Sequence, residues 1–222
     1  MTGVLALVGG AEWTEGCDFD RSLLEASGTD EVLLLPTAAA FENPRRCIEQ
    51  ATSWFEPLRA RVTPLEVYGR QDATDPAKAE AVRRARFVYL SGGSPLHLRS
   101  ALKETPVWEA LRAAWDDGAV VAGAGAAAGA LSEPMVDPRG GALTVGLGLV
   151  VNLAFVPHAP ADLDADPDHK RTLDLAKGGV AVAAVPDRTA LIRDRDGGWR
   201  TEGAGGVRVF VDGVERGLDA LP

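Results

Sequence analysis

Residues Val120–Leu131, with the sequence VVAGAGAAAGAL, run from a predicted buried strand directly into a predicted helix. A turn of small residues between a strand and a helix has two common uses in proteins. It exposes a nucleophilic side chain in a strained backbone conformation, or it lets a phosphate group approach the N-terminus of the helix. This stretch therefore bears on both the fold and the chemistry of the chain.

The sequence before this stretch alternates short apolar runs with segments of helical periodicity. The predicted strands are Val4–Val8, Glu31–Leu35, Val62–Tyr68, Arg86–Leu90 and Ala119–Ala122. The predicted helices between them are Arg21–Ser27, Pro44–Arg59, Asp75–Ala85 and Pro106–Asp116. Strands that alternate with helices indicate right-handed crossovers, so we expect an α/β fold with a doubly wound, mostly parallel sheet flanked by helices.

Beyond residue 131 the sequence changes to short strand-like runs separated by Gly, Pro and Asp. These runs are Ala142–Asn152, Ala154–Val156, Val180–Val185, Thr189–Ile192 and Val207–Val211. We interpret them as the far half of the same sheet plus a C-terminal β-hairpin. Because no internal repeat or long linker divides the sequence, we expect residues 1–222 to form a single domain.

The composition excludes several classes of protein. The chain has 222 residues, of which 46% are hydrophobic and 25% charged, as in soluble globular proteins. Its net charge of −9 repels phosphate backbones, so we expect no nucleic-acid partner. The longest weakly polar stretch, Gly118–Leu131, is too short to cross a bilayer. With two cysteines and no basic N-terminal segment, the sequence predicts a cytoplasmic protein that does not bind membranes.

Ligands of an open parallel sheet bind beyond the carboxyl ends of its strands, and the segments at those ends resemble a known family. LALVGGAEW (5–13), LLLPTAAA (33–40), FVYLSGGSPLHL (87–98), GAVVAGAGAAAGALSEPMVDPRGG (118–141) and LAFVPHAP (153–160) are similar, in this order, to segments of the dipeptidase E and cyanophycinase family of serine peptidases. The resemblance implies a class I glutamine amidotransferase-like, flavodoxin-like sheet. It also implies a parent activity on small acidic peptides.

The nucleophile of that family is missing from this sequence. The family motif at the turn reads approximately Gly-x-Ser-Ala-Gly-Ala, and two alignments are possible. An alignment that begins at Gly123 puts Gly125 at the serine position but leaves Ala127 where the second glycine belongs. An alignment that begins at Gly125 matches everywhere except the serine and puts Ala127 at the nucleophile position. We take the second alignment as the better one.

The resemblance also implies roles for other residues. His158 matches the general base of the family, and Asp137 is our candidate for the acid that orients it. Amides of Gly92, Gly93 and Ala128 are expected to form an oxyanion hole. Ser94 stands where the family usually has Asn, which weakens any transfer of substrate preference.

Alanine cannot attack a carbonyl, so we predict a catalytically silent homologue that binds a small acidic peptide, another acidic small molecule or a partner in the former active-site cleft. The first alternative is an active hydrolase that uses water or a substitute nucleophile with His158 as base. A weaker alternative is a nucleotide-binding module built on Gly123, Gly125 and Gly129. No cofactor and no metal are expected, and the sequence leaves the oligomeric state open between monomer and homodimer.

Overall fold

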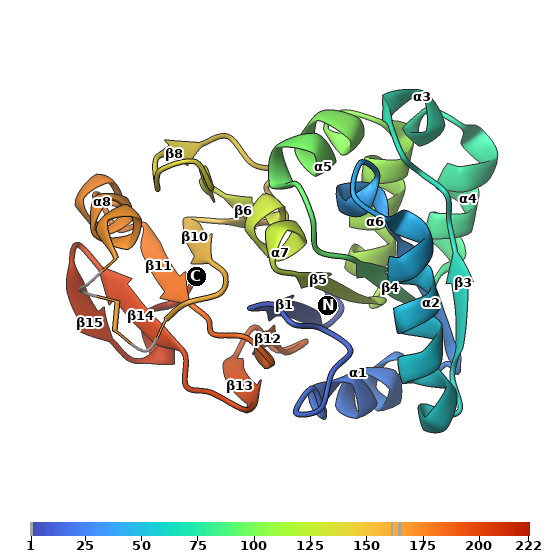
Figure 1. Ribbon diagram of the computed structural model, residues 1–222, viewed down its shortest axis with the longest axis horizontal. Helices are drawn as coiled ribbons and strands as arrows, with labels where there is room; N and C mark the ends of the chain where they lie inside the picture. The colour runs from blue at the N-terminus through green and yellow to red at the C-terminus, as the bar shows by residue number, and fades with distance from the viewer. Residues whose placement is uncertain (1, 161, 164–165) are drawn as a thin grey trace.

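A computed structural model describes residues 2–160, 162–163 and 166–222 of the chain. Within these residues a seven-stranded sheet forms the centre of the molecule (Figure 1). From edge to edge its strands are β13 (Trp199–Gly203), β12 (Thr189–Arg193), β1 (Leu5–Val8), β5 (Val120–Ala124), β4 (Phe87–Leu90), β2 (Glu31–Leu35) and β3 (Arg61–Pro64). The five strands from β1 to β3 are parallel, and β12 and β13 add to the β1 edge in antiparallel pairs.

Helices cover both faces of this sheet because side chains alternate between the faces along each strand. Leu5 and Leu7 of β1 belong to one apolar cluster, whereas Ala6 and Val8 belong to the other. The first cluster includes residues of α3 (Arg70–Ala73), α4 (Pro76–Arg84), α5 (Pro95–Leu102), α6 (Pro106–Asp116) and α7 (Ala126–Leu131). The second includes residues of α1 (Phe19–Ser27) and α2 (Pro44–Phe55). The doubly wound α/β fold is therefore confirmed.

Four helices begin with the same local chemistry, and three of them, α2, α4 and α6, were predicted from the sequence. In α2, α4, α5 and α6 the first helical residue is proline, whose missing N–H costs nothing there. The residue before each proline caps the helix with a side-chain oxygen: Asn43, Asp75, Ser94 and Thr105. The described chain also contains short 3₁₀ helices at Thr37–Ala39, Glu56–Leu58 and Leu218–Ala220.

The C-terminal part of the chain differs from our expectation. Within the described residues it contributes only β12 and β13 to the main sheet, while a second sheet has the strand order β15-β14-β11-β10-β6-β9. Its strands are β15 (Val214–Arg216), β14 (Arg208–Val211), β11 (Ala181–Ala184), β10 (Leu153–Val156), β6 (Ser132–Glu133) and β9 (Val150–Val151). The predicted strand 142–152 is two short strands, β8 (Leu143–Thr144), which pairs with β7 (Met135–Val136), and β9. The C-terminal hairpin is formed by β14 and β15.

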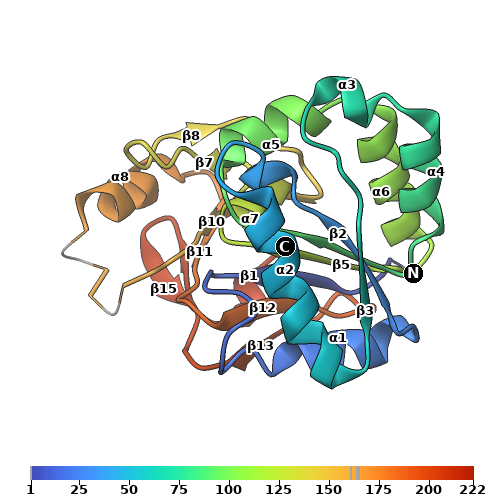
Figure 2. The same cartoon turned by 45° about the vertical axis from the view of Figure 1, so that its right-hand side comes forward.

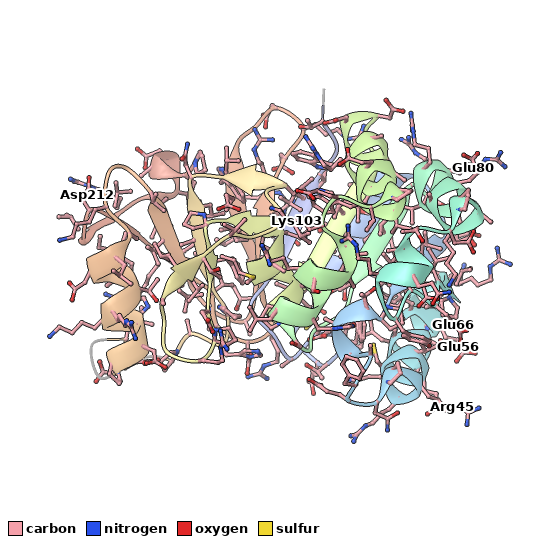
Figure 3. All side chains as sticks on the ribbon, turned by 90° about the horizontal axis from the view of Figure 1, so that it is seen from above. Arg45, Glu56, Glu66, Glu80, Lys103 and Asp212 are labelled. Atoms are coloured by element: carbon pink, nitrogen blue, oxygen red, sulfur yellow. The ribbon has the colours of Figure 1, made fainter. Side chains whose placement is uncertain are left out.

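The second sheet packs beside the main one and carries α8 (Pro167–Leu175) on its outer side (Figures 1 and 2). One apolar cluster continues through both sheets, since it contains Leu191 of β12 as well as Phe155 of β10 and Ala183 of β11. Lys103, which lies centrally in Figure 3, follows α5 and donates from its Nζ to the carbonyl oxygen of Gly146, 2.9 Å away. These contacts fix the second sheet against the carboxyl ends of the parallel strands.

Gly9 permits a close approach between the N-terminal and C-terminal parts of the chain. It follows β1, and a β-carbon there would lie 2.1 Å from the carbonyl oxygen of Pro186, just beyond β11. We expect Gly9→Ala to lower the free energy of unfolding by about 2 kcal/mol, the usual scale for overpacking against a rigid neighbour. Denaturant titration measures the change, and Gly69→Ala is the control because a β-carbon at Gly69 meets no atom within 4 Å. Equal stabilities of the two variants would contradict this prediction.

Candidate active site

The turn between β5 and α7 has the backbone of a strained elbow. Gly125 occupies it with φ 50° and ψ −111°, a conformation that residues with side chains rarely adopt. The N–H of Gly125 donates to the carbonyl oxygen of Val8, 2.8 Å away, so the turn is tied to the end of β1. A β-carbon at Gly123 would lie 3.1 Å from the nitrogen of Ala128 and 2.8 Å from Leu131, so the glycine there lets α7 pack onto the strand.

His158 and Asp187 form a hydrogen-bonded pair beside this elbow. His158 follows β10 and Asp187 follows β11, and these neighbouring strands are parallel, so their carboxyl ends lie at one edge of the second sheet. Nδ1 of His158 lies 2.7 Å from Oδ1 of Asp187. A β-carbon at Gly10 would lie 2.1 Å from Cε1 of His158 and 2.6 Å from Oδ1 of Asp187. The pair therefore packs directly against the backbone of Gly10, where only glycine fits.

Gly125, and not Ala127, is the residue that faces the histidine. A β-carbon at Gly125 would lie 3.2 Å from Nε2 of His158. Ala127 lies inside α7, is fully buried and packs in the apolar cluster beneath the sheet. Our choice between the two alignments was therefore wrong, because strict motif matching cannot register where the strand ends and the helix begins. The absence of a serine at this turn stands in either alignment.

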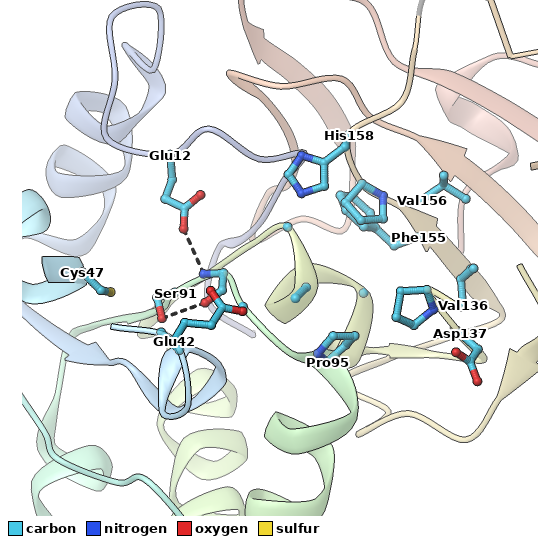
Figure 4. A pocket seen from close by; sticks show the side chains of 18 of the residues that line it. Glu12, Glu42, Cys47, Ser91, Pro95, Val136, Asp137, Phe155, Val156 and His158 are labelled. Atoms are coloured by element: carbon cyan, nitrogen blue, oxygen red, sulfur yellow. Dashed lines mark hydrogen bonds between the residues drawn. The ribbon is translucent and has the colours of Figure 1, made fainter. Parts of the chain in front are cut away.

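Asp137 does not pair with His158. Its carboxylate binds Arg139, with 2.9 Å from Nε of Arg139 to Oδ1 and 2.6 Å from NH2 to Oδ2. These hydrogen bonds lower the pKa of Asp137 to about 2. In Figure 4 Asp137 lies beyond Val136, away from the ring of His158. The carboxylate that pairs with His158 is that of Asp187, which we missed although it lies two residues after the predicted strand Val180–Val185.

The amides expected to form an oxyanion hole are arranged differently from our prediction. The N–H of Gly92 donates to Oε1 of Glu12, 2.9 Å away, so it is occupied by a carboxylate (Figure 4). Ala128 is fully buried within α7, and its carbonyl oxygen accepts from Ser132. The hydroxyl of Ser94 caps α5 by accepting from the N–H of His97. A β-carbon at Gly93 would clash with the backbone of Ala38, so this glycine permits a close chain crossing.

Glu12 is a second residue that sequence reasoning missed. It follows the glycines after β1, and its two neighbours, Ala11 and Trp13, have φ values of 50° and 58°. Left-handed backbone at residues other than glycine is uncommon and must be held by its surroundings. Figure 4 shows Glu12 and His158 near the same turn, and both residues line the cavity that Gly125 also lines. A carboxylate and an imidazole thus face the same space beside Gly125.

A cavity of about 730 Å³ opens in front of these groups. Gly92, Gly93, Gly125, Asp137 and His158 all line it, together with Cys47, whose thiol has a pKa raised by burial. Its charged lining is mostly acidic, since Arg46 is accompanied by Glu12, Glu42, Asp137, Asp166 and Asp168. A second hollow, of about 390 Å³, shares His158 and is lined by Asp187 and Arg188. His158 therefore lines both spaces.

Residues 5–198 match peptidase family S51. The chain belongs to this family. It is 26% identical over 227 aligned positions to a cyanophycinase of Trichormus variabilis, covering 96% of this chain and 74% of that protein. It is 25% identical over 214 positions to a cyanophycinase of Synechococcus elongatus, covering 95% of this chain and 66% of that protein. The family predicted from the sequence is thus confirmed.

Two solved structures extend the S51 comparison. The crystal structure of a peptidase from an acI-B1 Actinobacterium superposes with a TM-score of 0.85 at 27% identity, covering 97% of this chain and 93% of that one. A putative peptidase E protein of Listeria monocytogenes superposes with a TM-score of 0.64 at 18% identity, covering 92% of this chain and all of that one, and shows the same fold. The mixed α/β fold of this chain is therefore shared with both structures.

Gly123, one of the glycines of the nucleotide-binding alternative, serves the packing of α7, and nothing in the structure tests nucleotide binding itself. No cluster of three or more potential metal ligands is present in the described part of the chain. No helix among the described residues is long and apolar enough to span a bilayer.

Proposed function

We propose that this S51 homologue forms no acyl-enzyme and instead binds a small peptide in the former catalytic cleft. The observation that carries the proposal is the position of Gly125, which has no side chain and faces Nε2 of His158 at the elbow. An acyl-enzyme needs a nucleophilic oxygen or sulfur at that point. The occupation of the Gly92 amide by Glu12 supports the same conclusion, because a carboxylate there opposes an oxyanion.

The charges of the cleft bear on the class of peptide. The acidic ligand predicted from the family resemblance would meet a single cationic side chain, Arg46, among the described lining residues. Glu12, Glu42, Asp166 and Asp168 face it instead. We therefore expect a peptide that carries at least one positive charge, such as a free N-terminal amine, to bind more tightly than one whose amine is blocked.

Binding and turnover of dipeptides test the proposal together. Asp-Xaa dipeptides, with free and with acetylated amines, are titrated into the wild-type chain by calorimetry while product release is followed by chromatography. We expect binding without cleavage, and weaker binding of the acetylated forms. Gly125→Ser should cleave the dipeptides that the wild-type chain binds, because it restores an oxygen beside His158. Cleavage by the wild-type chain through a covalent acyl intermediate would overturn the proposal.

A further inference from the structure

The open space beside Gly125 suits a reaction that needs no side-chain nucleophile. We propose that His158 and Asp187 activate a water molecule there for direct attack on activated esters. This inference rests on the proposed function in one respect, since both require Gly125 to face His158 at the elbow. It goes further because it assigns a noncovalent hydrolytic reaction to the pair.

The elbow leaves room for a water oxygen at hydrogen-bonding distance from the base. A β-carbon at Gly125 would already lie 3.2 Å from Nε2 and 3.7 Å from Cε1 of His158. Because glycine has no such carbon, the Nε2 edge of the ring stays open to the cavity that Gly125 and His158 both line, and solvent in this cavity can reach Nε2. General-base catalysis requires about 2.6–3.2 Å between the base and the oxygen that it deprotonates.

The histidine is held in the tautomer that the reaction needs. Asp187 lies 2.7 Å from Nδ1, so the ring proton belongs on Nδ1 and the lone pair on Nε2. The backbone N–H of His158 donates to the carbonyl oxygen of Gly9, 2.9 Å away, with φ 54° at the histidine. In the described part of the chain no hydrogen bond to Nε2 is formed, so this nitrogen is available to a ligand or to water.

The reaction balances with water as the one co-reactant. Nε2 of His158 accepts a proton from water while the water oxygen forms a bond to the acyl carbon, and the carbonyl electron pair moves to its oxygen. Collapse of this tetrahedral species breaks the bond to the alcohol oxygen, which leaves with its electron pair and takes the proton back from His158. The products are a carboxylic acid and an alcohol, with no oxidation or reduction.

The site restricts the reaction to acyl groups with weakly basic leaving groups. The Gly92 amide is bound to Glu12 and gives no help to the oxyanion. Loss of one oxyanion donor typically costs about 10²–10³-fold in rate, whereas a positioned base contributes about 10²–10⁴-fold. We therefore expect aryl esters such as p-nitrophenyl acetate to react, and unactivated amides to remain intact.

Steady-state hydrolysis of p-nitrophenyl acetate tests this inference. We expect the wild-type chain to release nitrophenol linearly, without an initial burst, and more slowly in D₂O because a proton moves in the rate-limiting step. His158→Gln should lower the rate at least tenfold, and Gly125→Ala should do the same because its methyl group would stand 3.2 Å from Nε2 and block the approach of water. The control is His97→Gln, whose ring bonds to the carbonyl oxygen of Tyr68 and does not line the cavity.

Three results would overturn the inference. These are equal rates for wild type, His158→Gln and Gly125→Ala, a burst with acetylated protein detected by mass spectrometry, or the absence of any solvent isotope effect. Circular dichroism establishes that each variant is folded before its rate is compared. A negative ester result leaves the proposed peptide binding intact, since that function is measured by calorimetry, while failure of peptide binding leaves the ester result unaffected.

Discussion

Gly125→Ser is expected to react covalently with a fluorophosphonate probe, whereas the wild-type chain is not. A serine hydroxyl at residue 125 would extend one bond beyond a β-carbon that lies 3.2 Å from Nε2 of His158, within reach of the base. Such probes label hydroxyls that an adjacent base has activated. Gel detection of the label and mass spectrometry of the labelled peptide measure the result.

Ala127→Ser is the matched control for this experiment. It introduces the same hydroxyl two residues further along, inside α7 and fully buried. Labelling of Ala127→Ser but not of Gly125→Ser would show that the elbow is misplaced by two residues. Because the backbone at Gly125 is strained for any side chain, Gly125→Ser should also lose about 1–3 kcal/mol of stability. Gly125→Ala carries the same strain without a hydroxyl and should remain unlabelled.

The same labelling reaction separates the two candidate acids. We expect Asp187→Asn, introduced into Gly125→Ser, to slow labelling on the order of 10³–10⁴-fold, the scale seen when the orienting carboxylate of a serine peptidase triad becomes an amide. Asp137→Asn in the same background should change the rate little, since Asp137 binds Arg139. A large loss in Asp137→Asn would contradict the assignment of Asp187 as the orienting acid.

The second large expected effect concerns stability and not catalysis. Asp20, at the start of α1, is fully buried, and Nε1 of Trp54 donates to its Oδ2 from 2.8 Å. Burial raises the pKa of Asp20 to about 8, and the charge of Glu12 adds to this effect. The folded chain therefore keeps a proton that the unfolded chain releases near pH 4, so folding stability falls as pH rises from about 4 to about 8.

Asp20→Asn should remove this pH-dependent loss of folding stability, because the amide never ionises. Its oxygen can still accept the hydrogen bond from Nε1 of Trp54. Between the pKa of the unfolded chain and that of the folded chain, each pH unit lowers the free energy of unfolding by somewhat over 1 kcal/mol. We expect the variant to gain about 3–4 kcal/mol over the wild-type chain between pH 5 and pH 8. Urea titrations at both pH values measure this difference. The exposed Asp30→Asn is the control, and a pH-independent difference for Asp20→Asn would contradict the prediction.

Local signals predicted most of the N-terminal architecture. The strand Glu31–Leu35 and the helix Pro106–Asp116 have the bounds expected from the sequence, because apolar periodicity and a Thr-Pro cap define them locally. Among the C-terminal strands, Thr189–Ile192 was assigned to the correct sheet, whereas Ala154–Val156 and Val180–Val185 were assigned to the wrong one. Strands of two to four residues have little intrinsic preference for a partner, so their pairing depends on packing against the rest of the fold.

Some features of the candidate site were likewise predictable from the sequence, and others only from the structure. The sequence by itself determined that no serine stands in the turn after β5, and that His158 follows a strand at the ligand-binding edge. Only the tertiary structure decided that Gly125 faces His158 and that Asp187 and Glu12 complete the site. The reason is physical: a motif fixes residue order within one segment, whereas these contacts join chain segments that lie far apart in the sequence. Their distances follow from how two sheets pack across the glycines after β1.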